Sequence, residues 1–229
     1  MNYLQLCQQL VEDAGIAGSF TTTAGTTGEF SRVTNWIKRA VTEIEGLWFD
    51  WDFLYVDGPT NPVSMVIGQN DYPPGSLVNM WDKDAFIRTA QNSVLEYWLW
   101  ERVKNQPELV TNGDPYAFTI LPNKSIRIYG TPTAVESIQM PYWLKPTVLT
   151  DDVDVPLIPE QFHDIVVYKA LEYYANYESA EEVKLQAVEG YRARLRQLES
   201  FACPARQEHG NRNTGIDIQI LAEGSNYGY

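Results

Sequence analysis

The stretch from Asn112 to Tyr177 constrains the fold most, because its periodicity changes from strand-like to helical within one run. It opens with a turn, Asn112-Gly113-Asp114-Pro115, and continues as short segments in which apolar and polar residues alternate. An acidic, proline-bounded loop, Thr150–Pro156, then leads into a long segment with a dense apolar face. This order predicts a small sheet that feeds a helix through a fixed loop, and no catalytic motif interrupts it.

Four segments have the apolar spacing of amphipathic helices. They are Tyr3–Ala14, Glu29–Gly46, Pro159–Tyr177, and a segment from about Ser179 to Phe201. Asn2 is a suitable N-cap for the first, and Ser179 with Glu182 has the spacing of a capping box for the last. We expect the first two helices to form an antiparallel pair and the last two to form a second helical hairpin.

Between the helix pairs, the sequence is rich in strand and turn signals. Trp51–Asp57 alternates and predicts a strand that pairs with Val63–Ile67. Further predicted elements are a hairpin of Tyr116–Leu121 and Ser125–Tyr129, a strand at Ile138–Leu144, and a short helix at Leu95–Lys104. Because every connection between these strands is short, we expect an antiparallel sheet.

The predicted fold class is α+β: an antiparallel bundle of about four helices with an inserted small antiparallel β-domain and an extended C-terminal tail. The expected divisions are residues 1–50 for the first helix pair, 51–150 for the β-domain, 151–203 for the helix hairpin and 204–229 for the tail. With 229 residues, 44% of them hydrophobic, the chain can bury a sizeable core.

The formal net charge is −13, and Lys and Arg form no cluster of the kind that grips a phosphate backbone. This excludes a tightly held DNA ligand. An acidic surface suits a passage to which DNA does not adhere, and it equally suits solubility alone.

Two cysteines, Cys7 and Cys203, lie at opposite ends of the chain among apolar neighbours and are predicted to be buried thiols. The first ten residues lack a basic region, and no apolar run reaches the roughly 20 residues that span a bilayer. We therefore expect a protein that is made and kept in solution, with no membrane partner.

The sequence offers little for catalysis. Of two histidines, His163 is predicted to be structural, and His209 lies in the tail. Asp151, Asp152 and Asp154 suggest a cation site, but the glycine and glutamate of a calcium loop are absent, which favours a solvated acidic loop. We expect no enzyme activity, no cofactor and no metal.

The candidate interface residues are aromatic or strand-like. Trp98 and Trp100 lie in a dense aromatic cluster that suits a subunit interface, a sugar-stacking surface or an ordinary core. In the tail, Ile216, Ile218 and Ile220 alternate within a polar context. Such a segment can add a strand to a neighbouring sheet or fray as a terminus.

The order of motifs resembles that of tailed-bacteriophage head-to-tail adaptor proteins, also called connector, head-completion or portal-adaptor proteins. The similar motifs are the aromatic exit Trp48-Phe49-Asp50-Trp51, the turn Gly68-Gln69-Asn70-Asp71-Tyr72-Pro73, the pair Gly113-Asp114-Pro115-Tyr116 and Ile126-Arg127-Ile128-Tyr129-Gly130, and Pro146–Pro159 leading to Ala170-Leu171-Glu172-Tyr173. The segment Arg88–Lys104 departs from the pattern in its aromatic density.

This resemblance implies a virion protein that forms a dodecameric ring beneath the portal. The ring would extend the DNA channel, retain the genome and offer a platform for tail or nozzle proteins, while DNA passes without specific binding. Assembly would take place in the host cytoplasm. The alternative is a non-enzymatic carbohydrate- or protein-binding module that uses exposed aromatic side chains.

Overall fold

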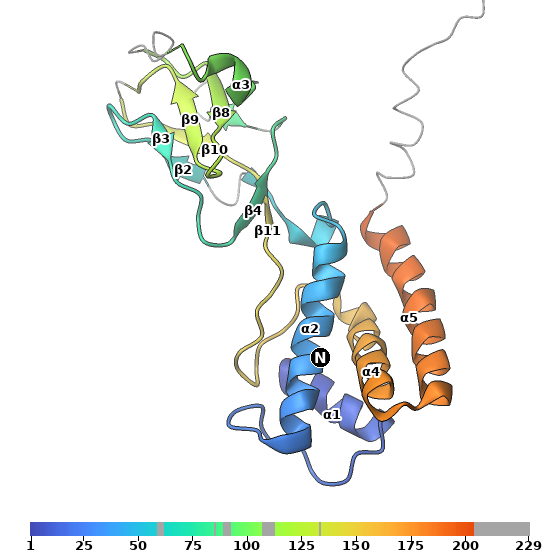
Figure 1. Cartoon of the computed structure of the whole chain (residues 1–229). Coiled ribbons are helices and arrows are strands. Elements are labelled where there is room, and N and C mark those ends of the chain that lie inside the picture. The colour runs from blue at the N-terminus through green and yellow to red at the C-terminus, as the bar shows by residue number, and fades with distance from the viewer. Residues whose placement is uncertain (59–61, 85, 89–92, 107–112, 133, 204–229) are drawn as a thin grey trace, which may run out of the picture.

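The computed structural model describes residues 1–58, 62–84, 86–88, 93–106, 113–132 and 134–203. Figure 1 shows two parts: a helical lobe of α1, α2, α4 and α5, and a β lobe of short strands that also carries α3. The helices are α1 (Tyr3–Asp13), α2 (Gly28–Leu47), α3 (Trp100–Val103), α4 (Asp164–Glu178) and α5 (Glu181–Ala202). The expected mixture of helices and small sheets is confirmed; the predicted tail lies outside the described residues.

The helical lobe has one apolar core to which α1, α2, α4 and α5 all contribute. Asn2 caps α1 in a reciprocal capping box: its side chain accepts from the Gln5 N–H at 2.9 Å, and the Gln5 side chain accepts from the Asn2 N–H at 2.9 Å. A 3₁₀ turn, Glu160–Phe162, precedes α4 and places Phe162 in this core, and Ile165 of α4 is buried in the same core. Cys7 and Cys203 are both buried there, as predicted.

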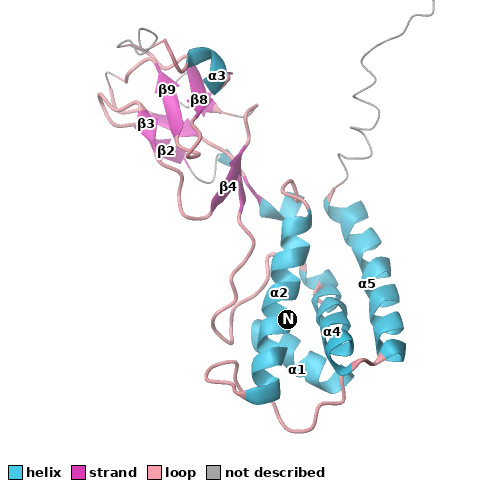
Figure 2. Cartoon of the chain, in the orientation of Figure 1, coloured by secondary structure: helices cyan, strands magenta, loops and turns pink. Residues whose placement is uncertain are grey.

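The β lobe contains eleven short strands within the described residues, arranged in three sheets (Figure 2). The strands are β1 (Tyr55–Val56), β2 (Pro62–Ser64), β3 (Asp71–Tyr72), β4 (Val78–Trp81), β5 (Ile87–Arg88), β6 (Ser93–Val94), β7 (Glu96–Tyr97), β8 (Ala117–Ile120), β9 (Ile126–Tyr129), β10 (Ser137–Gln139) and β11 (Tyr142–Leu144). Their orders are β1-β11-β4, β2-β10-β5-β6 and β3-β9-β8-β7. The predicted hairpin of β8 and β9 is confirmed, with Phe118 opposite Ile128.

Several strand predictions are wrong. Asp52–Leu54 is a 3₁₀ turn, so only Tyr55–Val56 is extended, and it pairs with β11 rather than with β2. The predicted strand at 138–144 is two strands in different sheets, because Pro141 lacks an N–H and the chain changes sheet there. The β7–β8 pair is parallel, which an expectation of purely antiparallel pairing misses.

Two helix predictions are also wrong, one in the β lobe and one between α4 and α5. The segment 95–104 forms β7 and a single turn of helix, α3, instead of one helix. Ser179 does not cap α5: it ends α4 in the left-handed conformation, with φ 57°, and the N-cap of α5 is Ala180, which makes no side-chain cap bond. The helix reversal between α4 and α5 therefore takes precedence over the local capping signal.

The sheet β1-β11-β4 joins the two lobes. Adjacent residues of β11 contact different cores: Tyr142 packs against the main cluster of the β lobe, whereas Trp143 packs against the helical core. Tyr55 of β1 lies beside Trp143, with ring centroids 5.1 Å apart. Because side chains alternate across a strand, one short strand supports both lobes.

Two of the motifs noted above meet in the β lobe. Gly130 follows β9 with φ 87°, and a Cβ there would lie 2.1 Å from the Asp114 carbonyl oxygen. The turn Gly68–Pro73 is bonded to the same strand, β9. The Asn70 side-chain amide donates to the Ile128 carbonyl at 2.9 Å, and Asp71 pairs with Arg127 at 2.7 Å. The glycine is required because only it permits this close backbone approach.

Candidate assembly surfaces

The loop that connects β11 to α4 is fastened from within by Glu45 of α2. The Glu45 carboxylate is fully buried and accepts hydrogen bonds from the Thr147 N–H at 2.5 Å and the Leu157 N–H at 2.9 Å. Burial raises the pKa of Glu45 although these bonds oppose the rise. One carboxylate thus joins α2 to both ends of the loop.

The aspartates of the same loop make specific internal bonds. Asp152 accepts from the Thr23 hydroxyl at 2.5 Å and the Thr23 N–H at 2.7 Å, and Asp154 accepts from the N–H groups of Thr150 and Asp151 at 2.6 and 2.8 Å. These bonds hold the pKa of each carboxyl below its usual range. The loop faces solvent, as the solvated-loop prediction expected, and in addition the carboxylates of Asp152 and Asp154 organise its backbone.

The start of α1 is hydrogen-bonded to this loop. The Tyr3 N–H donates to the Asp154 carbonyl at 2.7 Å, and the Leu4 N–H donates to the Asp152 carbonyl at 3.2 Å. Both donors belong to the first turn of α1, whose N–H groups have no partner inside the helix. The loop therefore receives support from α1, from α2 and from the 22–23 segment.

His163 has a structural place. It is 2% exposed, its Nε2 lies 2.7 Å from the Ile158 carbonyl oxygen, and its Nδ1 lies 2.5 Å from the amine of Met1. Burial lowers the pKa of this imidazole. The prediction of a structural histidine stands, although the side chain is more deeply buried than its polar neighbour Asp164 suggested.

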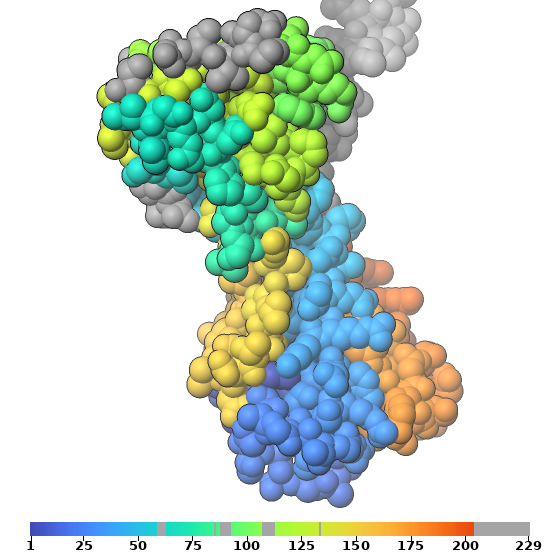
Figure 3. Space-filling view, turned by 60° about the vertical axis from the view of Figure 1, so that its left-hand side comes forward, coloured from blue at the N-terminus to red at the C-terminus, as the bar shows by residue number. Residues whose placement is uncertain are grey.

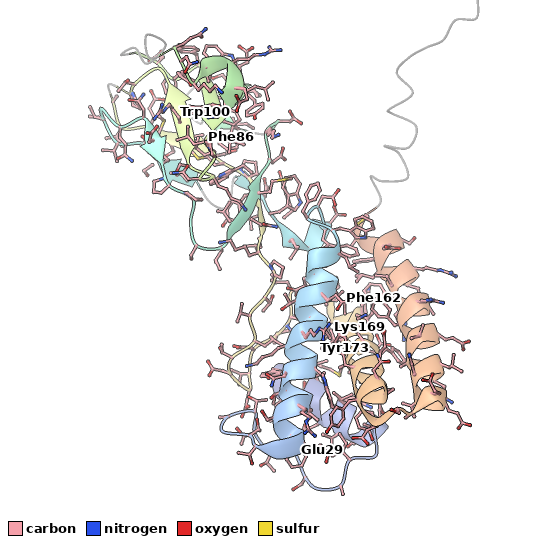
Figure 4. All side chains as sticks on the ribbon, in the orientation of Figure 1. Glu29, Phe86, Trp100, Phe162, Lys169 and Tyr173 are labelled. Carbon is pink, nitrogen blue, oxygen red and sulfur yellow. The ribbon has the colours of Figure 1, made fainter. Side chains whose placement is uncertain are left out.

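A polar network unites three helices at the side of the core. Lys169 of α4 lies 2.9 Å from the Glu43 carboxylate of α2, and the Tyr173 hydroxyl donates to the same carboxylate. The Lys169 ammonium also lies 5.0 Å from the ring centre of Tyr191 on α5. Figure 4 shows Lys169 and Tyr173 together beside α2. Helical spacing places Lys169 on the inward face, yet its partners come from other segments and have no sequence signal.

Trp98 and Trp100, the predicted interface aromatics, are half-buried in the β lobe. Trp98 packs against Tyr129 with ring centroids 5.1 Å apart, and Trp100 lies under the Arg127 guanidinium at 5.9 Å. Trp98 borders a hollow of about 570 Å³ beside α3, where Leu99 is 49% exposed; Trp100 is not part of its lining. Ile216, Ile218 and Ile220, the other predicted interface residues, lie outside the described residues.

Other kinds of site find little support in the described part of the chain. Those residues contain no cluster of three or more His, Cys, Asp or Glu side chains arranged to hold a metal ion. Among the helices described, none combines the length and apolarity needed to cross a bilayer.

Comparison with known families gives a match over nearly the whole chain. The model of the family described as SU10 adaptor protein matches residues 1–214, which include both lobes. A search of curated proteins returns no match. Since the matched region covers far more than half of the sequence, the chain belongs to the SU10 adaptor protein family, a family of phage head-to-tail adaptors and structural components of the virion.

Proposed function

We propose that this adaptor forms a ring beneath the portal, extends the DNA channel, helps to retain the packaged genome and gives tail components a docking platform. The observation that carries the proposal is the family match, which spans both lobes rather than one module. Its partners would be further copies of the chain, the portal protein, and tail or nozzle proteins. A dodecamer is the ring size that the adaptor resemblance implies, with assembly in the host cytoplasm.

The charge of the chain supports a passive passage for DNA. Thirty acidic residues against 17 Lys and Arg give a strongly negative molecule. A phosphate backbone that meets such a surface is repelled rather than held, so packaged DNA can move past without specific binding.

The arrangement of the lobes supports a division of labour. Residues 1–50 and 151–203 would act as one antiparallel bundle, residues 51–150 as an inserted β-domain, and residues 204–229 as a tail. Ile216, Ile218 and Ile220 would contact the portal or a neighbouring subunit. The hollow that Trp98 lines, next to Trp100 of α3, would face another virion protein.

Attachment to portal-bearing heads tests the proposal. Purified protein is mixed with heads that lack the adaptor, and bound copies per head are counted by quantitative gel and electron microscopy. Ring density beneath the portal is expected, and heads that acquire no ring would contradict the proposed function. A chain without residues 204–229 tests the tail separately: undiminished attachment would exclude a contact through Ile216–Ile220.

A further inference from the structure

The loop from Val148 to Leu157 presents an apolar edge to solvent. Its outward residues are Asp151, Val153, Val155 and Leu157, here named the valine ridge; Val153 is 75% exposed and Val155 is 54% exposed. The alternate residues point inward: Asp152 and Asp154 make the bonds described above, and Pro156 and Ile158 are buried. The valines are therefore displayed by a backbone that the fold holds in place.

Nothing within the described fold requires these valines. The bonds that fasten the loop use the backbone and the inward carboxylates, and none involves the side chain of Val153 or Val155. Burial of these side chains against a partner removes apolar area from water, which is favourable. Because the backbone of the loop is already fixed, binding does not add the entropy cost of ordering it.

A hollow of about 710 Å³ lies between the 3₁₀ turn before α4 and the C-terminal end of α5. Phe162 and Phe201 give it an apolar floor, with ring centroids 5.5 Å apart, and Phe201 is 56% exposed. Arg194 and Arg196 line it. Arg194 pairs with Asp164 at 2.6 Å, whereas Arg196 makes no ion pair with a carboxylate in the described part of the chain.

The two surfaces complement each other in charge. On the ridge, Asp151 is exposed, whereas Asp152 and Asp154 are hydrogen-bonded inside the loop. At the hollow, Arg194 is already paired with Asp164, so Asp151 and Arg196 are the opposite charges left to pair between copies. In a chain of net charge −13, two copies repel each other overall. A local pairing of opposite charges, here Asp151 with Arg196, offsets part of that repulsion where the two copies touch.

The surfaces lie on opposite sides of α2. Figure 1 and the turned view of Figure 3 both show the loop, in yellow, on one side of α2 and α5, in orange, on the other. A copy cannot place its own ridge in its own hollow. A contact between different surfaces of identical copies repeats from one copy to the next and closes into a ring when the rotation permits.

We propose that the valine ridge of one copy seats in the α5 hollow of the next, with Val153 and Val155 against Phe162 and Phe201 and Asp151 beside Arg196. This inference rests on the proposed ring and identifies its subunit contact. The occupant of the hollow is a second copy of this chain.

Charge reversal tests the pairing on portal-bearing heads. Arg196→Glu and Asp151→Lys are each expected to weaken the contact by about tenfold or more, because like charges then face each other. The double variant restores the opposite charges in exchanged positions and is expected to recover most of the ring occupancy. Arg32→Glu, an exposed arginine of α2 that lines neither hollow, is the matched control and leaves occupancy unchanged.

Cysteine cross-linking gives a second readout that does not depend on affinity. Val153→Cys and Ser200→Cys place thiols on the ridge and at the hollow, both at exposed positions. Under mild oxidation of assembled rings, the double variant is expected to form a ladder of covalent oligomers, whereas each single variant does not.

The outcomes separate this contact from the ring itself. The ridge-and-hollow contact would be overturned if both charge-reversed variants formed rings normally and if rings of the double cysteine variant gave no ladder. The proposed function would then still stand. Failure of the unaltered chain to form rings would overturn both. A ladder together with recovery in the double charge variant establishes the contact.

Discussion

The Glu45 carboxylate and the Thr147 N–H meet at 2.5 Å across 102 residues of sequence. This bond joins α2 to the segment that returns from the β lobe. The hydrogen bonds of the buried Glu45 carboxylate come mainly from backbone N–H groups. No Lys or Arg forms an ion pair with it in the part of the chain that the structure describes. The position of the loop, and of the valine ridge on it, depends on this side chain.

Replacing Glu45 removes the acceptor for two backbone donors. We expect Glu45→Leu to lower the free energy of unfolding by about 3 kcal/mol, because the N–H groups of Thr147 and Leu157 then lack partners in a buried site. Urea unfolding measures this. Glu12→Leu, an exposed glutamate of α1, is the control and should change stability by no more than about 0.5 kcal/mol. Equal effects would contradict the anchoring role.

The raised pKa of Glu45 predicts a direction for the pH dependence of stability. The folded state binds this proton more tightly than the unfolded state, so the contribution is fully present below the ordinary pKa of 4.5 and is lost as pH rises through the raised value. The stability of the unaltered chain minus that of Glu45→Gln should therefore fall as pH rises above 4.5. A difference that grows with pH would refute the assignment.

Gly130 is expected to be the least replaceable glycine among those with positive φ. Gly130→Ala puts a Cβ 2.1 Å from a backbone oxygen and should cost more than about 2 kcal/mol of stability. Gly68→Ala is the matched control: φ is 78° and nothing lies within 4 Å of the added carbon, so only the conformational cost of about 1 kcal/mol applies. Thermal unfolding of both variants distinguishes contact from conformation.

Asp152 and Asp151 are adjacent, yet their substitutions should differ. Asp152→Ala removes the acceptor of the Thr23 N–H, so hydrogen exchange at Thr23 should become faster. The side chain of Asp151 contributes no such bond, and Asp151→Ala should leave exchange at Thr23 unchanged. Faster exchange in both variants would mean that the loop depends on net charge rather than on this carboxylate.

Lys169 should contribute more to stability than an exposed lysine with a similar ion pair. Its side chain is 12% exposed and contacts Glu43 and Glu172, so Lys169→Met is expected to cost about 1–2 kcal/mol. Lys104→Met breaks an exposed pair with Glu101 and should cost less than about 0.5 kcal/mol. Chemical unfolding at moderate salt compares the two, and a smaller loss at Lys169 would show that the network is incidental.

Sequence reasoning predicted the bundle helices well and the β lobe only in part. The apolar stripe of α2 runs along a helix of 20 residues, so its periodicity is clear. Strands of two to four residues give too few alternations to fix a boundary or a partner, which is why Tyr55–Val56 was paired with the wrong segment. Local spacing also misled at Ser179, where the tight helix reversal decided the conformation.

The candidate surfaces were predictable to different degrees. Trp98 and Trp100 are conspicuous in the sequence. Only the structure shows that Trp98 packs against Tyr129 and that the Arg127 guanidinium lies over the Trp100 ring. The composition of the sequence predicts the acidic loop. The exposure of Val153 and Val155 depends on hydrogen bonds of the loop to Glu45 and Thr23, which are distant in the sequence. Contacts over such separations leave no local pattern.

Imaging of purified virions by cryo-electron microscopy tests the central claim most directly. The account predicts a ring beneath the portal into which both lobes of this chain fit, with the helical lobes side by side around a central channel. Virions that carry no density for this chain at the portal would contradict it.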